Sequence, residues 1–138
     1  MAGETTFSVE VLTPEGEVFS GDVVQLSTKT VGGELGVLAH HVPILAALKP
    51  NLLRLRISDS ETKVYAQSHG MLQVFANHAQ VLLEEAIPPE DLDAAALEAE
   101  RADAESRLND PHIGEAAKKA AERDIERTKA FLVLAQGE

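Results

Sequence analysis

The composition of the chain changes abruptly at Pro88-Pro89, and this change limits the possible fold more than any other feature. Residues 1–86 hold 7 of the 9 glycines and 19 Val, Ile or Thr residues, whereas residues 87–138 hold 12 alanines and only 5 β-branched residues. β-branched side chains favour strands, and alanine favours helix. The sequence therefore predicts a β domain over residues 1–86 and a helical domain over residues 87–138.

Short patterns of alternating apolar and polar residues recur in the first part, and they indicate strands that bury one face. Turn signals such as Pro14-Glu15-Gly16 and Asn77-His78 separate them with gaps of about 7–11 residues. This spacing predicts many short antiparallel strands in a sandwich or flattened barrel. The clearest alternating patterns are Phe7-Val9-Val11, Leu53-Leu55-Ile57 and Leu72-Val74-Ala76.

The second part reads as two helices, over residues 89–108 and 113–134, separated by Asn109-Asp110-Pro111. Each helix carries an apolar stripe dominated by alanine. Because small side chains bury little area, we expect the hairpin to be weakly held and able to detach. The expected stripes are Leu92, Ala95, Ala99 and Ala102 on the first helix, and Ala117, Ala121, Ile125, Thr128, Leu132 and Ala135 on the second.

Charge and residue types exclude several classes of function. With 23 acidic against 12 basic residues the net charge is −11, which disfavours binding to nucleic acid or to anionic lipid. The chain has no cysteine, and its five histidines show no metal-ligand spacing. It contains no nucleophile motif, no signal peptide and no apolar run long enough to span a bilayer. We expect a non-catalytic protein without a metal or cofactor.

Two segments are candidate interaction surfaces: the basic residues of the second helix and the apolar run from Glu34 to Pro50. On the second helix Lys119, Arg123 and Arg127 recur every fourth residue, either as a solvated face balanced by nearby glutamates or as a docking stripe for an acidic protein. The segment Gly32–Gly36 predicts a flexible turn, because no lysine or helix follows it as in a phosphate loop. The apolar run from Glu34 to Pro50 forms either core strand or an exposed contact patch.

Several blocks together resemble the epsilon subunit family of F-type ATP synthases, and the resemblance covers nearly the whole chain. The longest block runs Gly33-Glu34-Leu35-Gly36-Val37-Leu38-Ala39-His40-His41-Val42-Pro43-Ile44-Leu45. The others are Ala46–Pro50, Val11–Gly16, Val18–Asp22, His69–Val74 and Val81–Leu83. Ala39 and Asn51 depart from the proline and glycine that are common at those places.

The resemblance implies a flattened ten-stranded antiparallel β-sandwich followed by an antiparallel two-helix hairpin. It implies a non-catalytic rotor subunit of a proton-translocating ATP synthase, peripheral on the cytoplasmic face of the cell membrane, whose sandwich binds the γ subunit and the c ring. Carried over by position, a tight exposed loop presents Glu34, with Leu35 and Gly36, to the c ring. Thr13, His41 and Pro43 lie toward γ.

The resemblance also implies that the helical tail is a regulatory element. Extended along γ, it inhibits ATP hydrolysis when basic residues meet an acidic loop of the catalytic β subunit in the α/β head. The corresponding residues here are Lys118, Lys119, Arg123 and Arg127. Some family members bind ATP at the start of this helix, but the stretch from Glu115 to Lys119 departs from their motif at its aspartate and arginine positions, which argues against ATP binding here.

One reading from another class stays open at this point. A β-sandwich that binds its own ligand, with a helical tail used for dimerisation, would have the same composition. It predicts a stable homodimer and no affinity for γ.

Overall fold

The computed structural model describes residues 5–137, which form two compact units divided between Pro88 and Pro89. The first unit is a ten-stranded β structure and the second is a pair of helices, so the fold predicted from the resemblance is confirmed. The expected boundary after residue 86 falls inside the last strand, Ala86–Ile87, which pairs with an earlier strand of the sandwich.

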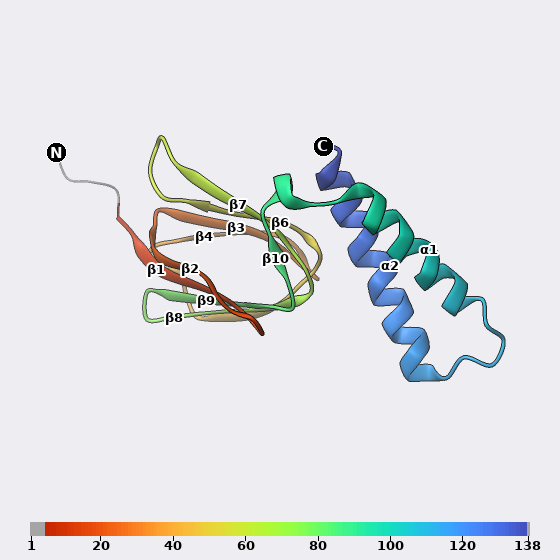
Figure 1. The fold of residues 1–138 in the computed structure, drawn as a ribbon. Coiled ribbons are helices and arrows are strands. Elements are labelled where there is room, and N and C mark those ends of the chain that lie inside the picture. Colours follow the sequence, from red (N-terminus) through yellow and green to blue (C-terminus); the bar gives the residue numbers. More distant parts are fainter. Residues whose placement is uncertain (1–4, 138) are drawn as a thin grey trace. The chain divides into compact units, whose positions relative to one another are not determined.

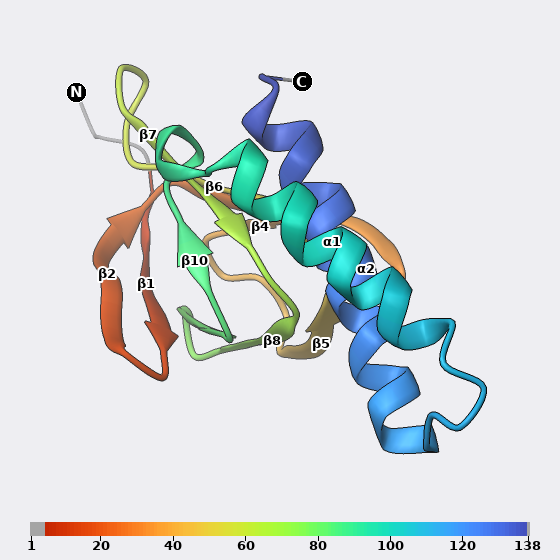
Figure 2. The same cartoon turned by 45° about the vertical axis from the view of Figure 1, so that its right-hand side comes forward.

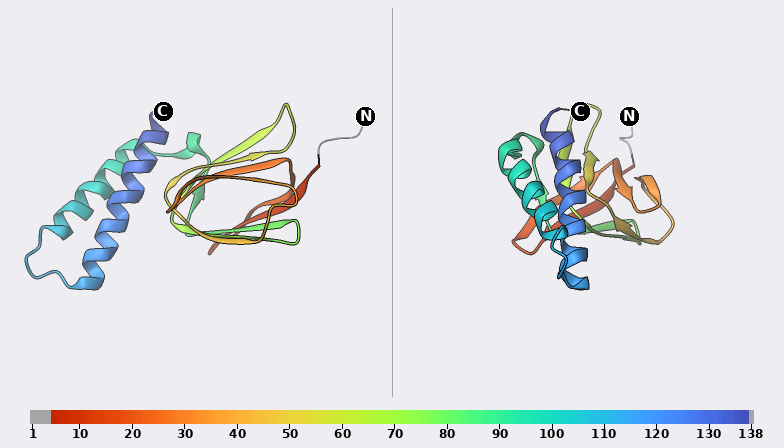
Figure 3. Two further views of the ribbon diagram at one scale, coloured as in Figure 1. Left: turned by 180° about the vertical axis from the view of Figure 1, so that it is seen from behind. Right: turned by 90° about the vertical axis from the view of Figure 1, so that its right-hand side faces the viewer.

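The ten strands form two layers that face each other, as Figures 1 and 3 show. In the first layer β4 (Gly33–Leu38) and β6 (Asn51–Arg56) flank β3 (Gln25–Thr30), and β7 (Thr62–Gln67) and β10 (Ala86–Ile87) follow β6. In the second layer the order is β5 (Ile44–Leu48), β8 (Gly70–Phe75), β9 (His78–Leu83), β1 (Phe7–Thr13) and β2 (Gly16–Val23).

Two pairings depart from a simple antiparallel arrangement. β1 runs parallel to β9, from Ser8 opposite His78 to Leu12 opposite Leu82, whereas the other strand pairs are antiparallel. Among the described strands, one pairing links the layers, that of Thr30 of β3 with Leu48 of β5. A parallel neighbour needs a long connection between its strands, and the chain from β1 to β9 passes through seven other strands. Local sequence patterns carry no signal for this pairing.

The core lies between the layers and is built from the alternate residues of each strand. Leu53 and Leu55 point inward from β6, and Leu72 and Val74 point inward from β8. These positions confirm the strand faces read from the alternation, except that Ala76 has a φ of 50° and lies in the turn after β8. The same core cluster contains Val9, Val11, Val23, Leu26, Val37, Ala79 and Val81.

Two tight turns use glycine in the left-handed region. Gly16 closes the β1–β2 hairpin opposite Thr13 with a φ of 126°, and Gly33 follows the β3–β4 turn with a φ of 122°. A side chain would be strained at either φ, and glycine is not. The hairpin predicted at Thr13–Gly16 is therefore confirmed. The threonine hydroxyl stabilises the turn by donating to the Gly16 carbonyl at 3.3 Å.

The helical unit begins with a single 3-10 turn, Pro89–Asp91, and the first α-helix starts later than expected. Helix α1 spans Ala94–Leu108, and the Asp93 carboxylate caps it by accepting from the Ala96 N–H at 3.1 Å. Helix α2 spans Glu115–Ala135 and lies antiparallel to α1 (Figure 2). The capping aspartate, rather than the proline pair, determines where the first helix begins.

The apolar stripe expected on the first helix is wrong, and the stripe on the second is only partly right. Ala95, Ala99 and Ala102 are exposed, and α1 instead buries Leu97 and Ala104. Because alanines occur on every face of this helix, their spacing does not identify the packed side. On α2 Ala121 and Thr128 are buried as expected, Ala117 is exposed, and Phe131, which the expected stripe omits, is completely buried.

Candidate interaction surfaces

Glu34, the residue expected to contact a ring of partners, lies in a strand rather than in a loop. The turn that precedes it is Val31-Gly32, and Glu34 pairs with Lys29 of β3 at the start of β4. Glu34 and Gly36 lie on the exposed outer face of the first layer. Leu35, the residue between them, is partly buried and packs against the core. Its side chain therefore points to the opposite face of the strand from Glu34 and Gly36. The expectation of a tight exposed loop here is corrected to a strand end.

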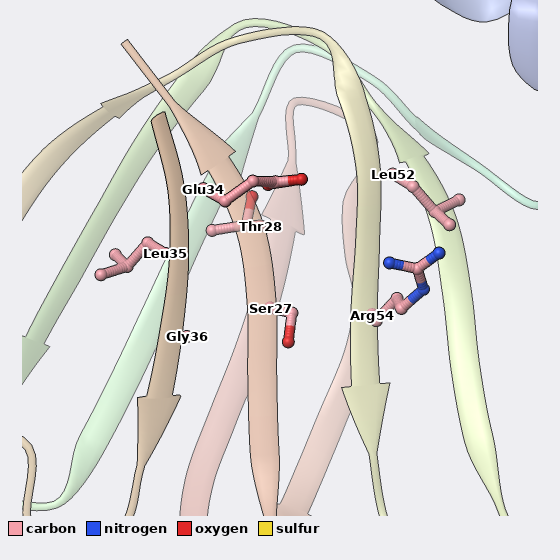
Figure 4. A pocket seen from close by; sticks show the side chains of 7 residues that line it. All are labelled: Ser27, Thr28, Glu34, Leu35, Gly36, Leu52 and Arg54. Atoms are coloured by element: carbon pink, nitrogen blue, oxygen red, sulfur yellow. The ribbon is translucent and has the colours of Figure 1, made fainter. Parts of the chain in front are cut away.

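An open depression of about 270 Å³ lies beside Glu34 on this face. Figure 4 shows Glu34 on one side of β3 and Arg54 of β6 on the other, with Ser27 between them. Among the described residues, neither the Glu34 carboxylate nor the Arg54 guanidinium takes part in an ion pair. Both charges are therefore available to a partner that covers this face.

The three residues expected to face a second partner do not lie together. Thr13 ends β1, while His41 and Pro43 lie in the loop between β4 and β5. This loop is tied to the opposite end of β1, because the Asn77 side chain accepts from the His40 N–H at 2.8 Å and donates to the Thr6 carbonyl at 3.1 Å. Strand β1 has seven residues, so the two ends are about 20 Å apart. Thr13 thus belongs to the end of the sandwich that carries Glu34.

The outer face of the second layer has an apolar part over β5, β8 and β9, whereas Glu10 and Gln80 make it polar toward β1. Leu45 of β5 is 70% exposed, and it stands opposite Gln73 of β8. Exposed apolar side chains continue across β8 and β9 at Met71, Phe75 and Leu82, and the loop before β5 adds Val42 at 67% exposure. We call Val42, Leu45, Met71, Phe75 and Leu82 the apolar face. Contiguous apolar surface of this kind marks an interaction site rather than ordinary solvent-exposed sheet.

The sequence indicated only half of this surface. It left open whether the segment Glu34–Pro50 was core or contact patch, and the structure divides it, with Val37 and Leu48 buried and Leu45 exposed. Met71 and Phe75 were missed. One signal was available. Leu72 and Val74 mark the buried face of this strand, so Met71 and Phe75 fall on the solvent face, where an apolar residue is unexpected.

The basic residues expected to form one docking stripe are in different environments on α2. Lys118 and Lys119 are exposed, and no described residue forms an ion pair with either of them. Arg123 is also exposed. Arg127 is only 14% exposed and donates to the Glu100 carboxylate of α1 at 2.5 Å. The docking stripe therefore begins with a lysine that forms no ion pair, Lys118, and ends with an arginine that is paired with Glu100, Arg127.

A second ion pair joins the helices further along. Arg107 of α1 donates to Asp124 of α2 at 2.8 Å and to Asp103 on its own helix at 3.0 Å. The hydrogen bonds that Arg107 donates to Asp124 and Asp103 raise the pKa of its guanidinium. Each helix thus contributes one arginine to its partner.

Two further expectations concern ligands and membranes. Glu115 is the first residue of α2 and Lys119 lies one turn later, and both are exposed. Within residues 5–137 no group of three acidic or histidine side chains could hold a metal ion. No helix in the same range is long and apolar enough to cross a membrane.

Comparison with known proteins gives a consistent result. The family model described as "ATP synthase, Delta/Epsilon chain, beta-sandwich domain" matches residues 6–89. The ATP synthase epsilon chain of a Sulfurihydrogenibium species is 32% identical over 94% of this chain and 96% of its own. That of Alkalihalophilus pseudofirmus is 40% identical over 76% of this chain and 78% of its own.

A solved structure has the same fold. A chain in the mitochondrial ATP synthase of Euglena gracilis, solved as an OSCP/F1/c-ring assembly, superposes with a TM-score of 0.78 at 21% identity. The match covers 96% of this chain and 83% of that one, so it includes strands and helices alike.

Proposed function

Because the chain belongs to the family of ATP synthase epsilon chains, we propose that it is a rotor subunit that couples the c ring to γ and restrains ATP hydrolysis through its C-terminal helices. Its sandwich connects the two partners mechanically, and catalysis takes place in other subunits. The proposed position is peripheral, on the cytoplasmic face of a proton-translocating complex. No cofactor is required for this role.

The observation that carries the coupling proposal is the apolar face. Leu45 and Phe75 are 70% and 48% exposed, and the strands of this layer contain no Lys or Arg. Such a surface suits permanent burial against a protein, and γ is the partner that the family supplies. Pro43 and His41 adjoin the face at Val42, which supports their expected proximity to γ. Thr13, at the far end of β1, would contact γ only at the other end of the sandwich.

The proposed c-ring contact lies on the other layer. Glu34 and Gly36 face outward from β4, and Arg54 flanks the same depression. The two proposed surfaces therefore lie on outer faces of opposite layers, and a packed core separates them. Since close-packed interiors deform little under load, a sandwich that binds γ on one side and the ring on the other would transmit torque.

The inhibitory part of the proposal rests on α2. Lys118 and Lys119 present unpaired positive charge in a chain of net charge −11, and the exposed Arg123 lies one turn further along the helix. An acidic loop of the catalytic β subunit is the proposed partner, with Arg127 reaching it in the inhibited state. ATP binding at Glu115 and Lys119 is not part of the proposal, because the segment departs from the family motif.

Two measurements test these parts separately. Purified γ should retain the full chain on a column, and loss of retention would overturn the coupling proposal. Deleting residues 89–138 should raise ATP hydrolysis by the reconstituted complex while leaving γ binding intact. Unchanged hydrolysis would overturn the inhibitory proposal alone. Light scattering that shows a stable homodimer without affinity for γ would instead support the ligand-binding sandwich with a dimerisation tail.

A further inference from the structure

Arg127 is the most enclosed cation of the helical unit, and its partners come from both helices. Glu100 of α1 lies 2.5 Å from the guanidinium, and Asp124 of α2 lies 3.8 Å from it. The guanidinium carbon also stands 5.8 Å from the centroid of the buried Phe131 ring. Of these three contacts, the one with Glu100 is lost when the helices separate, whereas Asp124 and Phe131 are on the same helix as Arg127.

This distinction matters for a hairpin that opens. Asp124 and Phe131 are on the same helix as Arg127, so their contacts with its guanidinium do not depend on whether the helices are packed together. Glu100 is near Arg127 only while α1 and α2 are packed together. Its contribution is thus a difference in free energy between the closed and open states, which is the only kind of contribution that shifts their populations.

We propose that Glu100 is an internal competitor for Arg127, which occupies in the closed hairpin the cation that would otherwise dock on the acidic surface of the catalytic head. This inference rests on the proposed function for its physiological consequence, but the competition itself is a property of the isolated chain. Arg127 then has two exclusive partners, and closing the hairpin removes one cation from the docking stripe. Lys118 and Lys119, which have no such partner, remain available in both states.

The rest of the helix interface stabilises the closed state together with this pair. The side chains buried between the helices are three small ones, Ala104, Ala121 and Thr128, and two large ones, Leu97 and Phe131. Apolar burial therefore rests mainly on these two large side chains, and the Glu100–Arg127 ion pair adds to it only while the helices are packed together. Increased salt should weaken it and favour opening.

The test replaces Glu100 and uses Glu98 as the matched control. Glu98 is 52% exposed and pairs with Arg101 within α1, whereas Glu100 is 50% exposed and pairs across the helices. Because the chain has no cysteine, Ser106→Cys and Ala120→Cys allow fluorescent labels on α1 and α2 of the full chain. Energy transfer between the labels then measures the ratio of open to closed hairpin.

We expect Glu100→Gln to raise the open-to-closed ratio about two- to five-fold, the effect of losing a partly exposed ion pair. Glu98→Gln should leave the ratio unchanged. In the reconstituted complex Glu100→Gln should deepen inhibition of hydrolysis, whereas Arg127→Gln should open the hairpin yet weaken inhibition, because it removes the shared cation from both states. This opposite sign distinguishes competition from simple loosening.

The results that overturn the proposal are specific. Equal ratios for Glu100→Gln and Glu98→Gln would show that Glu100 does not hold the closed state. Deeper inhibition by both Glu100→Gln and Arg127→Gln would show that Arg127 only loosens the hairpin when removed and is not shared. Failure of the proposed function is seen separately, as unchanged hydrolysis after deletion of residues 89–138.

Discussion

The Thr28 hydroxyl donates to the Gln67 side-chain carbonyl at 2.5 Å inside the sandwich, and both residues are fully or almost fully buried. The amide nitrogen of Gln67 donates in turn to the backbone carbonyls of Lys29 and Lys49, at 3.1 and 2.8 Å. One glutamine therefore joins β7, β3 and the turn after β5, close to the single pairing that connects the layers. Every part of this network is satisfied, as a buried polar group requires.

Thr28→Val should destabilise the sandwich by about 1–3 kcal/mol, because valine keeps the shape but leaves the Gln67 carbonyl without a donor. Urea unfolding followed by far-ultraviolet circular dichroism measures the change as a lower midpoint at constant slope. Thr62→Val, at an exposed position at the start of β7, is the control and should change stability by less than about 0.5 kcal/mol. Equal midpoints for the two variants would contradict the role assigned to the network.

Gly70→Ala should damage the fold far more than the equivalent change at another strand glycine. A Cβ at Gly70 would lie 2.1 Å from the Leu82 carbonyl oxygen, which belongs to the backbone of the adjacent strand and cannot rotate away. We expect a loss of about 1–3 kcal/mol or more, since β8 and β9 must separate locally. At Gly21 the nearest atom is the Phe19 ring at 3.4 Å, so Gly21→Ala is the control. Thermal unfolding of both variants compares them, and equal melting temperatures would refute the predicted clash.

Tyr65 gives the sandwich a predictable weakness at high pH. Burial raises the pKa of its phenol above the ordinary value of about 10. The unfolded chain then loses this proton at a lower pH than the folded one, so stability falls as pH rises above about 10 and is unaffected below it. Tyr65→Phe should remove this part of the decline. The chain has one tyrosine and no tryptophan, so ultraviolet absorbance follows the phenolate directly, and a titration midpoint at or below the ordinary value would contradict the prediction.

Leu45→Asp should weaken binding to γ about 5- to 30-fold while leaving the sandwich stable. Leu45 is 70% exposed at the apolar face, so its loss costs little in folding, but a desolvated carboxylate would be unfavourable in an apolar interface. Leu38→Asp is the matched control, because Leu38 is 55% exposed on β4 of the other layer. Titration calorimetry with purified γ compares the two. Equal loss of affinity would place the γ contact elsewhere than the apolar face.

Much of the fold follows from local patterns. The division at Pro88-Pro89, the alternation in β6 and the turn at Gly16 each reflect preferences of a few adjacent residues, and each is found in the structure. The first helical stripe was not predictable in this way. Alanine occupies every face of α1, so only contact with α2 shows that Leu97 and Ala104 are the packed side.

The candidate surfaces needed the tertiary structure for the same reason. Glu34 could be singled out from its motif, but its place at a strand end depends on pairing with β3, and the distance between Thr13 and His41 depends on the direction of β1. Likewise, a basic residue at every fourth position identifies Arg127 without showing that Glu100 lies beside it.

The sequence by itself thus determined the division into strands and helices and several of the turns, because these choices depend on neighbours within a few residues, although it placed Glu34 in a loop and began the first helix too early. The tertiary structure decided which strand lies beside which, as in the parallel pairing of β1 with β9, and which exposed side chains gather into one surface. Such contacts join residues about 70 positions apart, as in the 2.6 Å hydrogen bond between Ser8 and His78. Their formation depends on packing of the whole core rather than on any local preference.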